Sequence, residues 1–506
     1  MSPRESQTSE VRAKVTIDTT VPARAYDPMI FGGFLEHFDN QIYGGVFEPG
    51  SPLADQQGFR LDVIDALKEL KTPIIRWPGG CFVDSYHWQN GVGENRQAHG
   101  DPRWGVIEPN TFGTHEFIEL CRRLGAEPYI CHNGLTDVQE MADWVEYCNA
   151  TTGQLADMRK NNGQPEPFNV KYWSVGNERY DNAYVARVRD GAKAMKQVDP
   201  SILIACAGSQ GGMRSLGSEV SPYLLETAGV YLDYISVHDY WLPRGHKLPR
   251  SDFLTAVTKS EWPEAYMTLV CESLDKAGQR GRLGIAFDEW NLRAWQHPGF
   301  PRDEVEDYEA PGIRELVDRR MRENNLASQY TMADALFSAS FLNACLRHSD
   351  DVTIANIAPL VNTRGPLFVH PEGIVRRTHF HTMAMYANLL KERVANVEVM
   401  AEVLTLGESS VAAIDAIATV NDSGKNWAIA LVNRHPVNSV VCTLKMGEML
   451  LDGSHKATLL TGKSPDSYND IEYPDRVAPK ETELIFRTGS VNLLPHSLTI
   501  ALVEAV

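Results

Sequence analysis

The sequence predicts an α/β fold in which a (β/α)₈ TIM barrel is followed by a C-terminal antiparallel β-sandwich of jelly-roll type. Eight short apolar runs, most of them separated by segments of helical periodicity, lie within the first 390 residues. No Gly-x-Gly-x-x-Gly follows the first run, which argues against the rival open doubly wound sheet. After about Leu390 the chain changes to short apolar runs between turn residues, as in antiparallel β domains.

The expected barrel strands are near-continuous apolar runs, the pattern of parallel strands that are buried on both faces. They lie near residues 30, 74, 129, 173, 204, 236, 286 and 355, the first of them covering residues 28–37. The helices expected between them by apolar spacing cover residues 61–70, 115–124, 137–149, 182–197, 221–227, 265–277 and 328–345. A polar insertion rich in Trp, His and Gly, residues 84–110, follows the second strand. Alternation of this length predicts a parallel barrel.

The sandwich is predicted from six further runs, at residues 397–400, 411–418, 427–433, 440–445, 482–486 and 497–503. An alternating strand at residues 11–17 precedes Pro22 and has no obvious partner in the barrel. We therefore expect three parts: residues 1–22 contribute a strand to the sandwich, residues 23–390 form the barrel, and residues 391–506 form the sandwich.

Composition narrows the class of protein. Of 506 residues, 43% are hydrophobic and 23% charged, as in ordinary globular proteins. The net charge is 48 − 66 = −18, which argues against a nucleic-acid partner. No stretch is long and apolar enough to cross a bilayer, so we expect no membrane partner.

The first eight residues contain no apolar segment of the kind found in a secretory signal. The eight cysteines are scattered and form no Cys-x-x-Cys pair, which favours reduced thiols over a disulfide framework. A cytoplasmic location is the expectation, although a signal peptide already removed would leave the same sequence.

Polar residues end seven of the eight expected strands. Because active sites of such barrels lie at the C-terminal ends of their strands, these residues are candidate site groups. They are Glu36, His37, Arg76, His132, Asn133, Asn177, Glu178, His238, Tyr240, Asp288, Glu289 and Asn356. Two glutamates on separate strands, with amide, guanidinium and aromatic groups around them, fit glycoside hydrolysis, in which paired carboxyls supply a proton and a nucleophile.

Other interpretations stay open at this point. Either glutamate could cap a helix or form a salt bridge at the barrel rim. His37, His132 and His238 with Asp288 could ligate a metal in a metal-dependent hydrolase, although we expect no metal and no cofactor. A non-catalytic sugar-binding protein is a third possibility, but binding alone does not require two carboxyls. Three Trp residues of the insertion region could be core or a platform for sugar: Trp77, Trp88 and Trp104.

Five motifs in order resemble one family. Residues 173–178, Trp-Ser-Val-Gly-Asn-Glu, are similar to the Gly-Asn-Glu strand of clan A retaining glycosidases, and residues 287–291, Phe-Asp-Glu-Trp-Asn, to its nucleophile strand. Residues 34–37, 76–82 and 110–117 narrow the resemblance to family 51 of the glycoside hydrolases, the α-L-arabinofuranosidases. It extends from about Ile30 to the C-terminus, with residues 431–435 in the sandwich.

The resemblance implies a retaining exo-acting enzyme that releases terminal α-L-arabinofuranosyl units from arabinose-containing oligosaccharides and polysaccharides. Glu178 matches the acid/base and Glu289 the nucleophile. Substrate-binding positions by the same resemblance are Glu36, Arg76, Cys81, Trp104, Asn177, His238 and Tyr240. Family members are commonly hexamers, so a homo-oligomer is expected. Cys81 and Pro359 depart from the pattern expected of the family and leave activity on β-xylosides or β-glucan open as the alternative.

The chemistry can also be stated from the residue types. A positive Arg76 beside Glu289 would keep the nucleophile ionised, and the charge of Glu289 would raise the pKa of Glu178. Polar groups from different strand ends would enclose a single furanose, and the insertion would wall the pocket. Both features favour an exo-acting enzyme over one with an open cleft.

Overall fold

The computed structural model describes residues 11–211, 216–242, 253–297 and 307–504. Its N-terminal part is a closed barrel of eight parallel strands, so the predicted fold class is confirmed. Around the barrel the strands are β3 (Gly32–Phe34), β4 (Ile74–Trp77), β7 (Glu127–His132), β8 (Tyr172–Val175), β9 (Leu203–Gln210), β10 (Tyr234–Leu242), β11 (Gly284–Arg293) and β12 (Val352–Ile357).

Two differences between the barrel strands and the prediction affect the site. The first is only β3, because residues Pro28–Phe31 form a 3₁₀ helix, η1, before it. Asp27 caps this helix by accepting a hydrogen bond from the backbone N–H of Met29, and Pro28 suits its first turn. The fifth strand, β9, continues beyond the expected apolar run to Gln210. Both changes alter which side chains reach the C-terminal end of the barrel.

The expected helices are present within a few residues of their predicted bounds. They are α1 (Leu61–Glu69), α2 (Thr114–Leu124), α3 (Val138–Asn149), α5 (Asn182–Val198), α6 (Pro222–Thr227), α8 (Trp262–Lys276) and α10 (Met332–Arg347). Helices that the periodicity did not predict are α4 (Gln154–Asn161), α7 (Phe253–Val257), α9 (Pro311–Asn324) and α11 (Thr378–Leu389). Among the described residues, no helix combines the length and apolar character that crossing a membrane requires.

Short hairpins and 3₁₀ turns lie in the connections between the longer elements. The insertion carries a small hairpin, β5 (His99–Asp101) with β6 (Val106–Glu108), and two other hairpins are β13 (Leu367–His370) with β14 (Gly373–Arg376) and β17 (Val403–Leu406) with β18 (Ser409–Ala412). The remaining 3₁₀ turns are η2 (Cys81–Ser85), η3 (Trp88–Gly91), η4 (Gly229–Tyr231), η5 (Thr258–Glu261) and η6 (Ala327–Gln329).

The C-terminal part contains two β-sheets. The five-stranded sheet consists of β16 (Val397–Ala401), β1 (Val11–Ile17), β21 (Val440–Met446), β22 (Met449–Leu450) and β25 (Ser490–Leu493). The seven-stranded sheet consists of β2 (Arg24–Ala25), β15 (Arg393–Ala395), β19 (Ile414–Val420), β20 (Asn426–Asn433), β26 (Ser497–Glu504), β23 (Gly453–Thr461) and β24 (Lys480–Phe486). The expected run at 411–418 is thus divided between the β17–β18 hairpin and β19.

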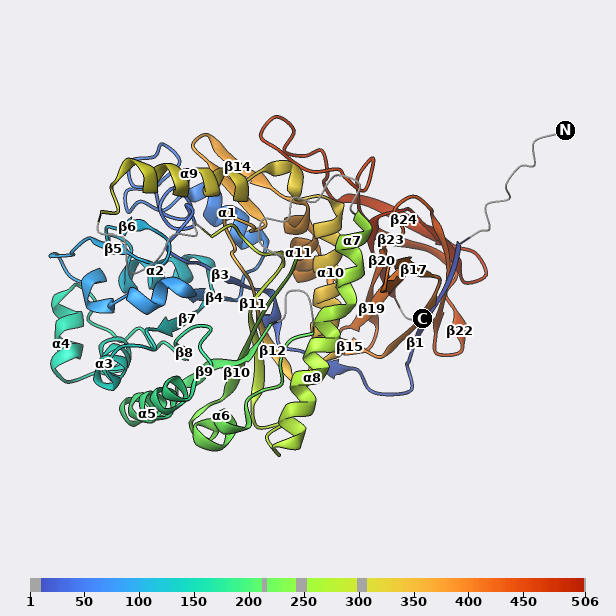
Figure 1. Ribbon diagram of the computed structural model, residues 1–506. Coiled ribbons are helices and arrows are strands. Elements are labelled where there is room, and N and C mark those ends of the chain that lie inside the picture. The colour runs from blue at the N-terminus through green and yellow to red at the C-terminus, as the bar shows by residue number, and fades with distance from the viewer. Residues whose placement is uncertain (1–10, 212–215, 243–252, 298–306, 505–506) are drawn as a thin grey trace.

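Strand β1 comes from the start of the chain but lies among these C-terminal strands, as the blue arrow beside the red ones shows (Figure 1). It pairs antiparallel with β16 and parallel with β21, so the sheet is not wholly antiparallel. Its alternating apolar residues, from Val11 to Ile17, are buried in the core of the sandwich. Residues 1–10, which contain the segment examined for a secretory signal, lie outside the described residues.

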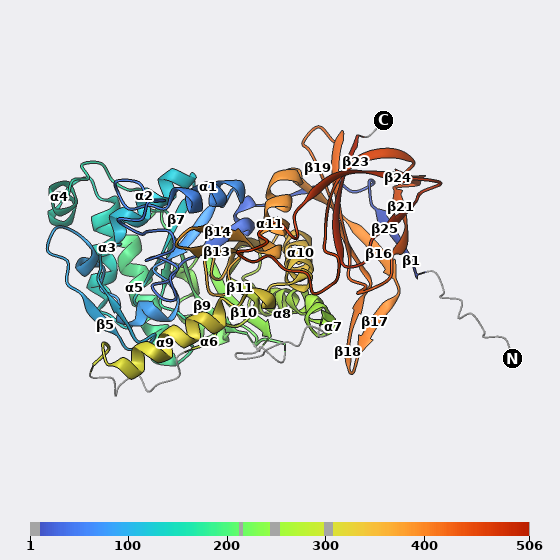
Figure 2. The ribbon, with the colours of Figure 1, turned by 90° about the horizontal axis from the view of Figure 1, so that it is seen from above.

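Helix α10 separates the barrel from the sandwich (Figures 1 and 2). Its residues 332–346 are all buried, because one side packs on the barrel and the other on the sheets. Polar contacts join the two sides. Asp415 of β19 accepts hydrogen bonds from Asn343 at 2.9 Å and from Arg347 at 3.0 Å, and Arg347 also contacts Glu264 of α8 at 2.6 Å.

Replacing Asp415 by Ala should destabilise the whole chain. The side chain of Asp415 is 8% exposed, so its loss leaves Asn343 and Arg347 without a buried acceptor. We expect a loss of about 2 kcal/mol in the free energy of unfolding, below the cost of a fully buried pair because Arg347 keeps Glu264. Urea denaturation at pH 7 measures it.

The matched control is Asp422→Ala in the same sandwich. Asp422 pairs with Arg393 at 3.6 Å and is 77% exposed, so its removal should change stability by less than about 0.5 kcal/mol. Equal effects of the two substitutions would contradict the role given to Asp415.

Candidate active site

A small pocket of about 200 Å³ lies at the C-terminal ends of the barrel strands. Both candidate catalytic glutamates line it, together with Cys81, Trp104, His238 and Tyr240. Six of the nine residues singled out from the sequence therefore meet at one cavity. The other three, Glu36, Arg76 and Asn177, lie directly behind its wall, where they contact the residues that line it.

Glu289 lies on β11, and its side chain is only 2% exposed. Nη1 of Arg76 donates to Oε1 at 2.7 Å, and the hydroxyl of Tyr240 donates to Oε2 at 2.7 Å. A Cβ atom at Gly80 would lie 2.9 Å from Oε1, so the absence of a side chain there gives the carboxylate its space. Two donors, one of them cationic, fix the position of this carboxylate.

Glu178 follows β8 through the turn Gly176-Asn177-Glu178. Gly176 has φ +71°, and a Cβ there would lie 2.7 Å from Tyr184, so this turn depends on glycine. Glu178 itself has φ +41°, an uncommon conformation for a residue with a side chain. The side chain of Glu178 lines the pocket and is 33% exposed, whereas that of Glu289 is buried.

The two glutamates come close to each other. One carboxylate oxygen of Glu178, one of Glu289 and a ring nitrogen of His238 lie within 4.8 Å of one another. Retaining glycosidases hold their carboxyl groups roughly 5–5.5 Å apart, whereas inverting enzymes separate them by about 6.5–9.5 Å to admit a water. The spacing in this pocket is that of the retaining class.

His238 bridges three carboxylates. Nδ1 lies 3.2 Å from Glu178 and 3.6 Å from Glu289, while Nε2 lies 3.2 Å from Asp288. Burial alone would lower the pKa of His238, but the charge of Glu289 and the hydrogen bonds to Asp288 and Glu178 outweigh burial and raise it to about 10. The ring is therefore a cation at neutral pH.

Asp288 is buried beneath this group. Burial alone would raise its pKa, but Arg76 at 3.3 Å and the contacts with His238 and Ser236 lower it to about 2. The hydroxyls of Tyr129 and Ser236 donate to its two oxygens at 2.8 and 2.6 Å. Asp288 is thus a fixed anion that orients both Arg76 and His238.

The polar residues behind the pocket complete one network. Asn177 accepts from Nη2 of Arg76 at 2.8 Å, and its amide nitrogen lies 3.8 Å from Sγ of Cys81. Sγ of Cys81 also accepts from Arg103 at 2.9 Å. The indole N–H of Trp104 donates to Oε1 of Glu36 at 3.0 Å.

Glu36 differs from the other carboxyls. Burial and the charge of Glu289 raise its pKa to about 8, although the backbone N–H of Phe82 and the indole of Trp104 donate to Oε1. Its second oxygen has no protein partner among the described residues. At neutral pH Glu36 is therefore a neutral acid with one hydroxyl group available to donate.

Several strand-end residues lie elsewhere. His37 donates to Glu108 at 2.7 Å and stacks on Phe82, while His132 bonds the carbonyls of Asn133 and Glu140. Asn356 donates to the carbonyl of Gly33. In the described parts of the chain these residues support loops and strands, so the metal site imagined around His37, His132 and His238 is not assembled.

The tryptophans have different positions. Trp77 and Trp88 are buried in the aromatic core around Trp144. Trp104 lines the pocket instead, so the insertion supplies one candidate platform for a sugar.

Sequence reasoning missed six residues of the pocket lining. They are Tyr180, Gln210, Gly211, Asp239, Ala294 and Trp295. Gln210 is the polar end of the fifth strand, the one strand for which none was identified, because β9 continues past the apolar run expected near residue 204. Trp295 lies just after β11 and could have been found by reading six residues beyond Glu289.

Comparison with known proteins agrees with this geometry. Residues 66–246 match the family described as "Alpha-L-arabinofuranosidase 1 domain", and residues 288–497 match "Alpha-L-arabinofuranosidase C-terminal domain". An α-L-arabinofuranosidase C of Emericella nidulans is 35% identical over 385 residues, 72% of each chain. An intracellular exo-α-(1→5)-L-arabinofuranosidase of Streptomyces lividans is 30% identical over 92% of this chain and 71% of its own.

Solved structures show the same architecture. An α-L-arabinofuranosidase from Thermotoga maritima in complex with arabinose superposes with a TM-score of 0.81 at 29% identity, covering 97% of this chain and all of the other. A family 51 α-L-arabinofuranosidase from Bifidobacterium longum gives 0.85 at 27% identity, covering 97% and 99%. The resemblance found in the sequence is confirmed, and the chain belongs to the α-L-arabinofuranosidases of glycoside hydrolase family 51.

Proposed function

We propose that this protein is a retaining exo-acting α-L-arabinofuranosidase that releases terminal arabinofuranosyl units from arabinose-containing oligosaccharides and polysaccharides. The observation that carries the proposal is the approach of Glu178 and Glu289 to within 4.8 Å across one small pocket. That spacing leaves no room for a water between carboxyl and sugar, so one carboxylate attacks directly.

The reaction has two steps in this proposal. Ionised Glu289 attacks the anomeric carbon, and the C–O bond to the leaving group breaks as Glu178 gives its proton to the departing oxygen. Glu178, now a carboxylate, takes a proton from water, whose oxygen attacks the anomeric carbon and frees Glu289. Arg76 and Tyr240 hold the nucleophile, and His238 hydrogen-bonds the carboxylate form of Glu178.

The furanose is held in this proposal by groups that surround the nucleophile. Trp104 provides an apolar wall that its hydrogen bond to Glu36 behind the pocket holds in place, and Asn177, beside Cys81 of the lining, serves the 2-hydroxyl. A cavity of about 200 Å³ suits one pentose and gives a chain little room to continue past it. An endo-acting glucanase needs an open groove instead, and Pro359 is not among the residues that line the pocket.

A metal-dependent hydrolysis is the second candidate, because Glu178, His238 and Glu289 offer three donor atoms at ligand spacing. Arg76 disfavours it, since a guanidinium bound to Glu289 at 2.7 Å would repel a cation there.

We further propose the natural polymer, the location and the oligomeric state. The polymer is arabinan or arabinoxylan, and the protein assembles into a hexamer. It lies in the cytoplasm, which the similarity to the intracellular enzyme of Streptomyces lividans supports. Division into parts at residues 22 and 390 is likewise proposed.

Glu289→Ala should lower turnover at least about 10⁴-fold on every substrate, because it removes the covalent step. A slowly hydrolysed 2-fluoro-arabinofuranosyl reagent should label Glu289 in the wild-type enzyme, and peptide mass spectrometry locates the label. A label on another carboxylate would refute the assignment.

Glu178→Ala should lose about 10²- to 10⁴-fold on arabino-oligosaccharides, whose alkoxide needs a proton. An activated aryl arabinofuranoside should lose far less in its first step, and azide should restore turnover as an arabinofuranosyl azide of retained configuration. Glu289→Ala serves as the control that azide should not rescue in this way. Equal losses on both leaving groups would argue against Glu178 as acid/base.

Product analysis tests the exo assignment. On arabinoxylan we expect free arabinose with little fall in viscosity, because single terminal units leave the main chain intact. A rapid fall in the viscosity of linear β-glucan without arabinose release would overturn the assignment.

Full activity after dialysis against EDTA is expected. A loss of activity that a divalent cation restores would favour the metal alternative.

A further inference from the structure

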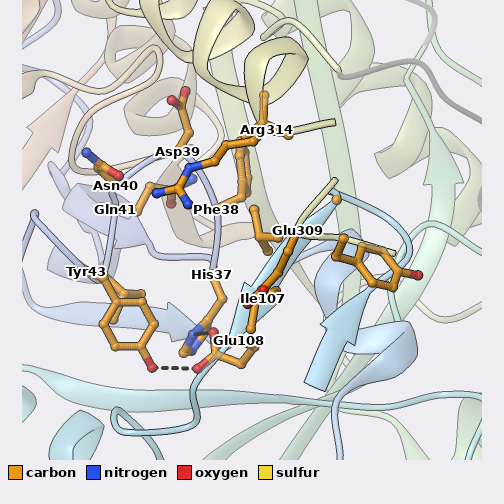
Figure 3. A pocket seen from close by; sticks show the side chains of 15 residues that line it. His37, Phe38, Asp39, Asn40, Gln41, Tyr43, Ile107, Glu108, Glu309 and Arg314 are labelled. Carbon is orange, nitrogen blue, oxygen red and sulfur yellow. Dashed lines mark hydrogen bonds and ion pairs between the residues drawn. The ribbon is translucent and has the colours of Figure 1, made fainter. Parts of the chain in front are cut away.

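A second and larger hollow lies beside the catalytic pocket. Its volume is about 430 Å³, within the usual range of ligand sites. Three segments surround it: the loop after β3, strand β6 of the insertion, and helix α9 with the residues just before it (Figure 3). Each segment belongs to a connection that follows the C-terminal end of a barrel strand, so the hollow lies at the same end of the barrel as the catalytic pocket.

The lining offers exposed hydrogen-bonding groups that no other described residue uses. Within the part of the chain that the structure describes, the side chains of Asn40, Glu309 and Arg314 have no hydrogen-bond or ion-pair partner. Figure 3 shows Arg314 reaching from α9 toward the loop that carries Asn40, with Glu309 facing it across the hollow. An amide, a carboxylate and a guanidinium together supply both donors and acceptors.

Apolar groups lie between these polar ones. Phe38, Tyr43 and Ile107 contribute to the lining, and Ile107 is 41% exposed. A few polar groups around aromatic and aliphatic surface are what a sugar ring requires, because its hydroxyls need partners and its C–H faces need apolar contact.

The charges in the hollow argue against an ionic ligand. The carboxylates of Glu108 and Asp39 are already bonded, the first to His37 and Tyr43, the second to Asn324 and Thr363. Among the lining residues that the structure describes, Arg314 is the one arginine or lysine beside three acidic residues, which disfavours an anion. The clusters of metal-ligand type among the described residues lie elsewhere. A neutral, hydroxyl-rich ligand remains.

The two cavities share a wall. Phe38 of the larger hollow stacks on Trp104 of the catalytic pocket, with ring centroids 3.9 Å apart and planes 11° from parallel. The ring of Phe38 also packs against that of Trp295, another residue of the catalytic pocket, with ring centroids 5.7 Å apart. A ligand packed against Phe38 therefore supports the aromatic wall that bounds the catalytic pocket.

We propose that this hollow binds a second neutral sugar unit of the same oligosaccharide whose terminal furanose occupies the catalytic pocket. The proposal rests on the function proposed above and adds to it a preference for substrates that extend beyond the scissile bond. A simple aryl arabinofuranoside would fill only the catalytic pocket.

The test compares two substrates in variants that fill the hollow. Val317→Trp introduces a large side chain from α9, where Val317 lines the hollow, and Ile107→Trp does so from β6. Glu315→Trp is the matched control, since Glu315 lies on the same helix outside the lining. The substrates are an aryl α-L-arabinofuranoside and an arabinofuranosyl-substituted xylo-oligosaccharide, each at pH 7.

We expect the ratio of kcat/KM for the oligosaccharide to kcat/KM for the aryl glycoside to fall about tenfold in both filling variants, equivalent to about 1.4 kcal/mol. In Glu315→Trp the ratio should stay at the wild-type value. An unchanged ratio in both filling variants would overturn the proposal. This holds whether both kcat/KM values stay at the wild-type level or fall together because the shared wall is damaged. A wild-type enzyme without aryl arabinofuranosidase activity would instead refute the proposed function.

Discussion

The guanidinium of Arg76 is the interaction on which the catalytic arrangement depends. It contacts Glu289 at 2.7 Å, Asn177 at 2.8 Å and Asp288 at 3.3 Å, and its side chain is 1% exposed. Two buried anions cannot stay ionised side by side without such compensation, because burial penalises charge and like charges repel. With Arg76 and the cationic His238, two positive groups balance the anions Asp288 and Glu289.

This balance also explains why Glu36 differs from its neighbours. No cation among the described residues pairs with Glu36, so burial and the charge of Glu289 raise its pKa to about 8. One carboxyl of the site is therefore a hydrogen-bond donor and another a nucleophile, although both belong to the same residue type. The surroundings of each glutamate, and not its residue type, decide its role.

The sequence predicts the barrel well because its strands are apolar runs and its helices are amphipathic, and both signals are local. Helices α4 and α9 are mostly polar, and α11 is buried on nearly all sides, so apolar periodicity carries no signal for them. Strand β23 escaped prediction for a similar reason, since Ala457 and Leu460 are its only fully buried residues. The larger hollow beside α9 could not be predicted without that helix.

The role of Asp288 shows the limit of strand patterns most clearly. Neighbouring residues of a regular strand point to opposite faces, yet Asp288 and Glu289 both contact Arg76. The register between β10 and β11 shifts between Ser236 and His238, and that between β11 and β12 shifts between Phe287 and Trp290. Such irregularities re-aim side chains near active sites. No local sequence signal announces the shift, because it depends on how three strands pair. The sequence identifies the carboxylates, but only the pairing shows that one orients the cations and the other faces the sugar.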